Sequence, residues 1–118
     1  MLSHRAILLA TPVYWYAMSG LMKTLFDRFS DLLAGRDPQA RARRLVGRDL
    51  WLLAVGTDLE MPVGFEVPFA RSADYLKLRW RGAGYVPARA APGERHARLA
   101  RLASRIAATL DPAPRRAG

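Results

Sequence analysis

The sequence predicts an α/β fold with a parallel β-sheet, and two observations carry this prediction. Short apolar runs stop abruptly at turn residues, which is typical of strands buried on both faces of a parallel sheet. A longer stretch with apolar residues at helical spacing follows each run. This alternation favours right-handed crossovers with helices on both faces of the sheet. We therefore expect three strands and three helices within residues 1–110, followed by a basic, proline-containing tail at residues 111–118.

The first strand and the first helix are expected near the N-terminus. Residues 6–10 form an apolar run that stops at a Thr-Pro pair, as a buried strand would. Between Ser19, a suitable N-cap, and Gly35, a suitable helix end, apolar residues recur at helical spacing. These residues are Leu21, Met22, Leu25, Phe26, Phe29, Leu32 and Leu33. The arginine-rich residues 36–48 have no sustained apolar face and are expected to form a polar connector.

The second and third strands are expected on either side of another helix. Residues 50–55 are an apolar run that ends in a Gly-Thr-Asp turn. Residues 65–78 are expected to form a helix, because four apolar side chains there share roughly one face. These side chains are Phe65, Phe69, Ala73 and Leu76. Residues 81–86 are diluted by glycine and closed by Pro87, which predicts a strand at the edge of the sheet.

The last helix is expected at residues 94–110, with one apolar face and one basic face. Its inward side chains should be Leu99, Leu102, Ile106 and Leu110. Its outward side chains should be Arg95, Arg98, Arg101 and Arg105.

Composition excludes several classes of protein. A chain of 118 residues is one domain or part of one, and 51% hydrophobic residues argue against disorder. The absence of cysteine excludes disulfides, thiolate-bound clusters and a cysteine nucleophile, and two histidines are too few for an ordinary zinc site, so no metal is expected. The uncharged residues 6–22 are interrupted by Pro12 and Gly20, which argues against a signal peptide and a membrane span. A cytoplasmic protein is the expectation.

The candidate ligand site lies beyond the carboxyl ends of the first two strands, where open α/β sheets bind ligands. Residues 14–16 are three consecutive aromatics, in a loop that leads directly to a helix N-terminus. Rings stack on rings, and a helix N-terminus favours partial negative charge, so a planar aromatic ligand is one interpretation. Aromatic clusters in loops are also found at protein interfaces. The residues alone leave both interpretations open.

Residues 6–29 resemble one family in particular. They are similar to the third strand, flavin loop and following helix of the flavodoxin-like NAD(P)H-dependent FMN reductases, with a hydrophobic strand, a Thr-Pro-x-Tyr-Trp stretch and a small-residue turn. The helical part of the pattern is matched by Leu21, Lys23, Asp27 and Arg28. The order of elements matches along the whole chain, but the motifs are specific only over about its first quarter.

The resemblance implies a flavodoxin-like three-layer fold, FMN as cofactor and NAD(P)H as co-substrate. Hydride would pass from NAD(P)H to flavin N5 and then to an acceptor. The flavin-binding residues it implies are Thr11, Pro12, Val13, Tyr14, Trp15, Met18, Ser19, Gly20, Gly56 and Thr57. It names no catalytic side chain, because the protein supplies placement and electrostatics, and it implies a homodimer. The acceptor and the choice between NADH and NADPH are not specified.

The chain departs from the family pattern at its start, which corresponds to the third strand of a flavodoxin-like domain. No glycine-rich loop that could hold the FMN phosphate precedes residue 6 or follows later. We expect either that Met1 is an internal start within a longer reading frame or that this is a half-domain that must pair. The first is favoured, because three strands bury little surface. A non-catalytic remnant that dimerises through its open sheet edge is therefore an alternative function.

The net charge of +9 raises a further alternative, a nucleic-acid-binding protein. Of the 19 basic residues, 17 are arginine, a bias that a GC-rich genome produces without any function. The aromatics lie in the apolar loop and not among the arginines, unlike a stacking platform for bases. We therefore interpret the arginines of the last helix as a solvated face, and nucleic acid is disfavoured as a partner.

Overall fold

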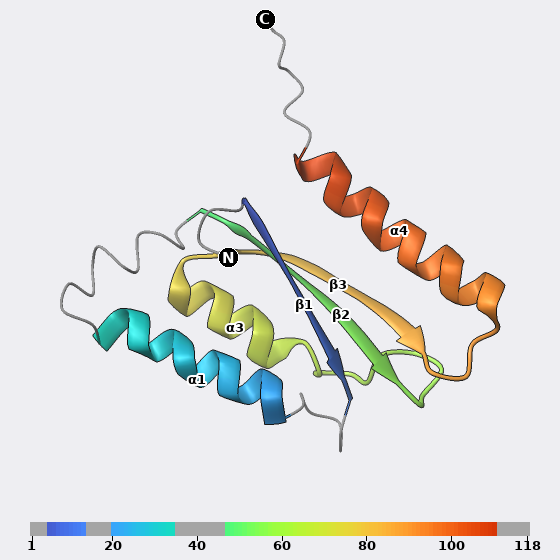
Figure 1. The fold of residues 1–118 in the computed structure, drawn as a ribbon, viewed down its shortest axis with the longest axis horizontal. Helices are drawn as coiled ribbons and strands as arrows, with labels where there is room; N and C mark the ends of the chain where they lie inside the picture. Colours follow the sequence, from blue (N-terminus) through green and yellow to red (C-terminus); the bar gives the residue numbers. More distant parts are fainter. Residues whose placement is uncertain (1–4, 14–19, 35–46, 111–118) are drawn as a thin grey trace, which may run out of the picture.

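The computed structural model describes residues 5–13, 20–34 and 47–110, which form three strands and three helices in strict alternation (Figure 1). The elements are β1 (Ala6–Pro12), α1 (Gly20–Ala34), β2 (Asp49–Gly56), α3 (Val67–Leu76), β3 (Arg79–Pro87) and α4 (Pro92–Leu110). The predicted α/β class and the predicted order of elements are both confirmed. The expected tail at residues 111–118 and most of the expected connector lie outside the described residues.

The three strands form a parallel sheet in the order β1-β2-β3. The register places Ile7 of β1 beside Leu50 of β2, and Leu52 of β2 beside Ala83 of β3. A register shift between Leu50 and Trp51 brings Gly82 opposite Trp51. Gly82 has a φ of 123°, a conformation that side-chain-bearing residues rarely adopt. β3 is an edge strand of the described sheet, as its glycine content predicted.

The two faces of the sheet are covered by different helices. α1 and α3 lie on one face and α4 lies on the other (Figure 1). The buried apolar core lies between the sheet and the helices α1 and α3, and alternate residues of β1 and β2 contribute to it. Its members are Ile7, Leu9, Met22, Leu50, Leu52, Ala54, Phe65, Phe69, Ala73, Leu76, Leu78 and Tyr85.

The bounds of every element except α1 differ from the predicted ones by one or two residues at one or both ends, and for α3 and β2 a reason can be identified. α3 begins at Val67, with Pro68 in the first turn, where its missing N–H breaks no helical hydrogen bond. It ends at Leu76, because Lys77 adopts a left-handed conformation with a φ of 64°. β2 begins one residue early, at Asp49, whose buried carboxylate lies 3.0 Å from Arg79 Nε and 3.1 Å from Arg81 Nε. Pairing with two guanidinium groups offsets part of the cost of burying this carboxylate.

The orientation predicted for the last helix is wrong in part. Leu102 is buried as expected, but Leu99 is 42% exposed and the side chain of Arg98 is only 20% exposed. The reason lies in the strand beneath, because a Cβ at Gly84 would lie 3.0 Å from Leu102 Cδ2. The glycine lets the helix approach closely, and the long aliphatic stems of its arginines then pack over the sheet.

One edge and part of one face of the described sheet stay open. β1 pairs with β2 alone among the described strands, and Leu8, on the face opposite the core, is 50% exposed. This is the open edge that the sequence predicted. Among the described helices, none combines the length and apolar character needed to cross a membrane.

Candidate functional site

The carboxyl ends of β1 and β2 are joined to each other beyond the last strand residue. The backbone N–H of Val13 donates a hydrogen bond of 2.8 Å to the carbonyl oxygen of Val55. This bond continues the β1–β2 ladder, in which Pro12 lies opposite Val55. The first residue of the loop after β1 is therefore fixed relative to the end of β2.

Gly56 is the point at which both loops and β3 meet. A Cβ at this position would lie 3.2 Å from Val13 Cβ and 2.7 Å from the hydroxyl oxygen of Tyr85. The Gly56 carbonyl accepts a hydrogen bond of 2.6 Å from the N–H of Ala88. Any larger residue at position 56 would push the two loops apart, so the glycine sets how closely they approach.

Tyr85 holds the loop after β2 in place. Its hydroxyl donates a hydrogen bond of 2.8 Å to the carbonyl oxygen of Asp58. Burial raises the pKa of the Tyr85 hydroxyl above 10.0, and the Asp58 carboxylate adds to the rise, while the hydrogen bond to the Asp58 backbone and the charge of Arg98 oppose it. The hydroxyl is therefore protonated at neutral pH and is available as a donor.

The loop after β2 carries backbone donors that have no partner among the residues that the structure describes. Within the described residues, the N–H groups of Thr57, Asp58 and Leu59 donate no hydrogen bond. All three residues are exposed. Free amides at the carboxyl end of a parallel sheet suit a ligand with carbonyl or other acceptor atoms along one edge.

The described flavin-site candidates from the sequence have different surroundings. Thr11 is only 2% exposed, and its hydroxyl donates to the carbonyl of Pro12 at 2.9 Å, so its side chain stabilises the strand end. Pro12 is exposed beside it. Gly20 is the first residue of α1, and a Cβ there would meet no atom within 4 Å. No described contact joins Gly20 to Val13 or Gly56.

Four further candidates, Tyr14, Trp15, Met18 and Ser19, lie outside the described residues.

The sequence analysis did not identify Tyr85 as a site residue and used it only as part of a strand. Its position could have indicated a role, because it is an aromatic residue with a hydroxyl group near the carboxyl end of a predicted strand, just before Pro87. In the described part of the chain, no group of three or more histidine, aspartate or glutamate residues could hold a metal ion.

The comparison with protein families matches the segment that carries this site. The family described as NADPH-dependent FMN reductase matches residues 1–59, which is half of the chain. The chain belongs to the NADPH-dependent FMN reductase family. The matched residues include β1, α1, β2 and the loop that Tyr85 holds. The resemblance found in the sequence is confirmed at the level of the family.

One relative in sequence is YwqN of Bacillus subtilis, which carries the name of an NAD(P)H-dependent FMN-containing oxidoreductase. It is 37% identical over 54 residues, which make up 44% of this chain and 29% of that protein. The chain thus matches less than a third of that relative's length, and the activity of the whole relative is not carried over with the match.

Solved structures with the same fold include three proteins of low sequence identity. A Trp repressor binding protein from Bacillus subtilis has a TM-score of 0.71 at 22% identity, over 88% of this chain and 64% of that one. A flavodoxin, WrbA-like protein from Agrobacterium tumefaciens has a TM-score of 0.68 at 16% identity, over 92% and 69%. General stress protein 14 from Treponema denticola, solved in complex with FMN, has a TM-score of 0.58 at 18% identity, over 90% and 65%. The predicted flavodoxin-like fold is confirmed.

Proposed function

We propose that this chain supplies the flavin-ring-binding edge of an FMN-dependent NAD(P)H oxidoreductase. The observation that carries the proposal is the junction of the two loops, where Val13 is hydrogen-bonded to Val55 and packs against Gly56. Family membership at residues 1–59 supports the same cofactor. Bound FMN would supply the chemistry, by accepting hydride at N5 and passing electrons to an acceptor.

The described residues fit an isoalloxazine ring in two respects. The half-buried side chain of Val13 offers a small apolar contact, and the buried Gly56 keeps it close to the end of β2, because a Cβ at position 56 would lie 3.2 Å from Val13 Cβ. The free N–H groups of Thr57, Asp58 and Leu59 are donors for the carbonyl oxygens on the polar edge of the ring. Such donors stabilise negative charge on the ring as they would in an oxyanion hole.

The remaining candidates are assigned by proposal to positions around the ring. Tyr14 and Trp15 would hold the ring by stacking on it or bordering it, and Pro12 and the turn from Met18 to Gly20 would contribute further contacts. Thr57 closes the opposite side. Tyr85 acts on the site through the loop and Gly56, so we assign it a positioning role.

The experiment is a titration of FMN with the purified chain, following flavin fluorescence and oligomeric state together. We expect quenching at micromolar protein, and at least a tenfold weaker affinity when Tyr14→Ala and Trp15→Ala are combined, since base-like stacking is worth about 1–3 kcal/mol per ring. Tyr75→Ala removes an exposed aromatic of α3 and is the matched control. Unchanged affinity in the double variant would contradict the proposal.

Asp27→Ala tests whether the helical part of the family pattern contacts the flavin. Asp27 accepts a hydrogen bond of 2.7 Å from Lys23 Nζ on the exposed side of α1. An exposed pair of this spacing contributes about 0.3–0.5 kcal/mol to stability. We expect Asp27→Ala to leave FMN affinity unchanged, and a loss as large as that of the aromatic variant would move the site onto the helix.

A second candidate function, a non-catalytic chain that dimerises, is favoured by the open edge of β1 and the half-exposed Leu8. The same titration separates the two. Concentration-dependent dimerisation without flavin quenching supports the second function, whereas quenching supports the first. The homodimer expected from the family resemblance stays a prediction for the flavin-bound protein.

A further inference from the structure

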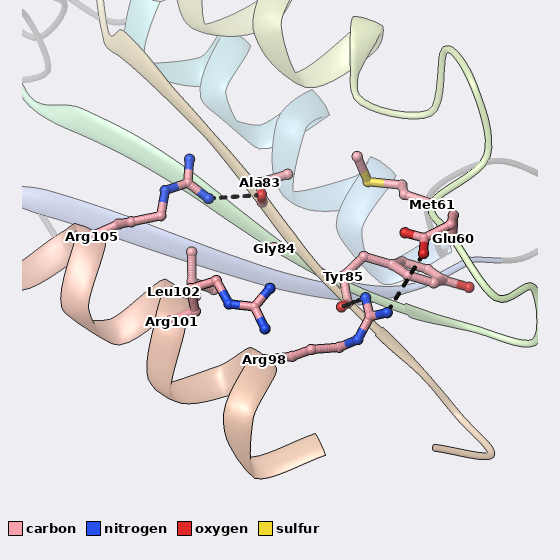
Figure 2. A pocket seen from close by; sticks show the side chains of 9 residues that line it. All are labelled: Glu60, Met61, Ala83, Gly84, Tyr85, Arg98, Arg101, Leu102 and Arg105. Carbon is pink, nitrogen blue, oxygen red and sulfur yellow. Dashed lines mark hydrogen bonds and ion pairs between the residues drawn. The ribbon is translucent and has the colours of Figure 1, made fainter. Parts of the chain in front are cut away.

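A groove of about 250 Å³ lies between β3 and α4, on the face of the sheet opposite the apolar core (Figure 2). Three arginines of α4 line it, together with the apolar side chains of Met61 and Leu102. Among the described residues of the lining, Glu60 is the one acidic residue against three arginines, so this part of the groove carries a net positive charge. The flavin-site candidates that the structure describes are not among its lining residues.

Two of the three arginines are held in place by the backbone of β3. Arg98 Nη1 donates a hydrogen bond of 3.1 Å to the carbonyl oxygen of Tyr85, and Arg98 Nε lies 3.1 Å from Glu94 Oε2. Arg105 Nη1 donates to the carbonyl oxygen of Ala83 at 3.3 Å, and its guanidinium lies 5.3 Å from the ring centroid of Trp51. These contacts fix the two guanidinium groups before any ligand arrives, which lowers the entropy lost on binding.

Arg101 is the third cation and is positioned differently. It lies three residues after Arg98 and four before Arg105, so all three share one side of the helix. Figure 2 shows its side chain between the other two, with no dashed line. Within the described residues it has no hydrogen bond or ion pair. Its five N–H donors are therefore available to a ligand.

The existing acidic neighbour does not neutralise the groove. Glu60 Oε2 is 3.6 Å from Arg98 Nη2, and the Glu60 side chain is 81% exposed. An ion pair this long and this exposed contributes little. Three guanidinium groups on one helix face repel each other, so an anion seated between them would relieve that repulsion.

The chemistry of the lining selects the class of anion. Guanidinium groups pair with phosphate through two parallel hydrogen bonds and with more than one oxygen at a time. Met61 and Leu102 offer an apolar wall for the rest of a molecule. A volume of about 250 Å³ is below that of most pockets for drug-sized ligands, roughly 300–1,000 Å³. We infer that this groove binds the phosphomonoester group of a small organic molecule, with Arg101 as the principal contact.

The test is a calorimetric or NMR titration of the purified chain without flavin, so its outcome is independent of the proposed oxidoreductase function. The probes are adenosine 5′-monophosphate, adenosine 2′,5′-bisphosphate, adenosine and inorganic phosphate. We expect at least one adenosine phosphate to bind about tenfold or more tightly than adenosine, because a charge-assisted hydrogen bond contributes about 1.5–3 kcal/mol. Tighter binding of adenosine 2′,5′-bisphosphate than of adenosine 5′-monophosphate would identify a site for a 2′-phosphate. Equal binding of the two would identify a general phosphomonoester site, and both results support the inference.

Arg101→Gln should weaken that binding by about tenfold while leaving the thermal unfolding midpoint unchanged or higher, since it removes a repelling charge. Arg101→Lys keeps the charge but not the paired donors, so its affinity for the adenosine phosphate should lie between that of the wild type and that of Arg101→Gln. Arg95→Gln is the matched control, because Arg95 lies on the same helix, is exposed and does not line the groove.

Three results would overturn the inference. One is the absence of binding by either adenosine phosphate at millimolar concentration. Another is an equal loss in Arg95→Gln and Arg101→Gln, which would reveal only the general positive field of the chain. The third is inorganic phosphate or a long single-stranded DNA binding as tightly as the adenosine phosphates, which would remove the requirement for a small organic body.

Discussion

The two faces of the sheet are packed in opposite ways. Under α1 and α3, large apolar side chains fill the space, and Phe69, Leu50 and Leu52 have less than 2% of their surface exposed. Under α4, the strand has glycines at two positions, and arginine stems and a single buried leucine cover it. The sheet therefore has an apolar face, under α1 and α3, that stabilises the fold, and an arginine face, under α4, that holds guanidinium groups close to the backbone.

This difference predicts where the free energy of unfolding originates. A fully buried large apolar side chain contributes about 1.5–3 kcal/mol, whereas a cation over an aromatic ring contributes about 0.5–2 kcal/mol. On the arginine face, the buried indole N–H of Trp51 has no hydrogen-bond partner among the described residues, which costs stability. Substitutions on the face under α1 and α3 should therefore cost more unfolding free energy than substitutions on the face under α4.

The largest expected effect tests the apolar face directly. Phe69→Ala removes a fully buried ring whose centroid lies 5.6 Å from that of Phe65. We expect a loss of about 3–5 kcal/mol, because the transfer energy of the ring is lost and a cavity remains. Urea denaturation followed by circular dichroism measures this loss. The matched substitution on the other face is Leu99→Ala, since Leu99 lies on α4 and is partly exposed, and its cost should stay below about 1 kcal/mol. Equal losses would mean that the two faces contribute alike.

A smaller effect is expected where α4 meets the sheet. Gly84→Ala would place its methyl carbon 3.0 Å from Leu102 Cδ2 and 3.3 Å from Leu102 Cβ, which cannot rotate away. We expect a loss of about 1–3 kcal/mol from overpacking. Combining it with Leu102→Ala removes the 3.0 Å contact with Cδ2 and leaves only the contact with Cβ, so the double variant should lose less than the sum of the two single variants. Gly93→Ala is the control, because a Cβ there meets nothing within 4 Å. Additive losses would show that α4 moves freely over the strand.

The same difference between the faces explains which elements the sequence could predict. On the apolar face, strands and helices followed from periodicity alone, because burial of a stripe such as that of Phe69 and Ala73 is what stabilises them. On the other face, the rule that arginine points outward failed for Arg98. Its position depends on Gly84 and on the carbonyl of Tyr85, both distant in sequence.

The candidate site was predictable in its location but not in its internal contacts. The rule that ligands bind beyond the carboxyl ends of strands led to the loops after the first two strands, and the family resemblance named Val13 and Gly56 within them; a Cβ at position 56 would lie 3.2 Å from Val13 Cβ. The contact that fixes their loop comes from Tyr85, 27 residues after Asp58. A hydrogen bond between residues so far apart leaves no local pattern. Arg79 and Arg81 likewise pair with Asp49 only because β2 and β3 are neighbours.

Tyr85 makes contacts on both faces of the sheet. Its ring lies in the apolar core, while its carbonyl oxygen accepts a hydrogen bond from Arg98 on the other face. Tyr85→Phe keeps the ring and removes the hydroxyl that binds the Asp58 carbonyl. At neutral pH we expect a loss of about 1 kcal/mol, the usual net value of one such hydrogen bond.

The pH dependence of that loss separates the hydroxyl from the ring. The pKa of the Tyr85 hydroxyl is raised above 10.0 in the folded chain, so the unfolded chain gives up this proton first. The stability that depends on the protonated hydroxyl is therefore fully present below pH 10 and is lost as pH rises through the folded value. The difference in unfolding free energy between the wild type and Tyr85→Phe should shrink above pH 10, measured by urea denaturation from pH 8 to 11. Tyr75→Phe changes an exposed tyrosine and should show no such trend. A difference for Tyr85→Phe that stayed constant up to pH 11 would contradict the raised pKa of the hydroxyl, and a difference of zero at neutral pH would place the whole contribution of Tyr85 in its ring.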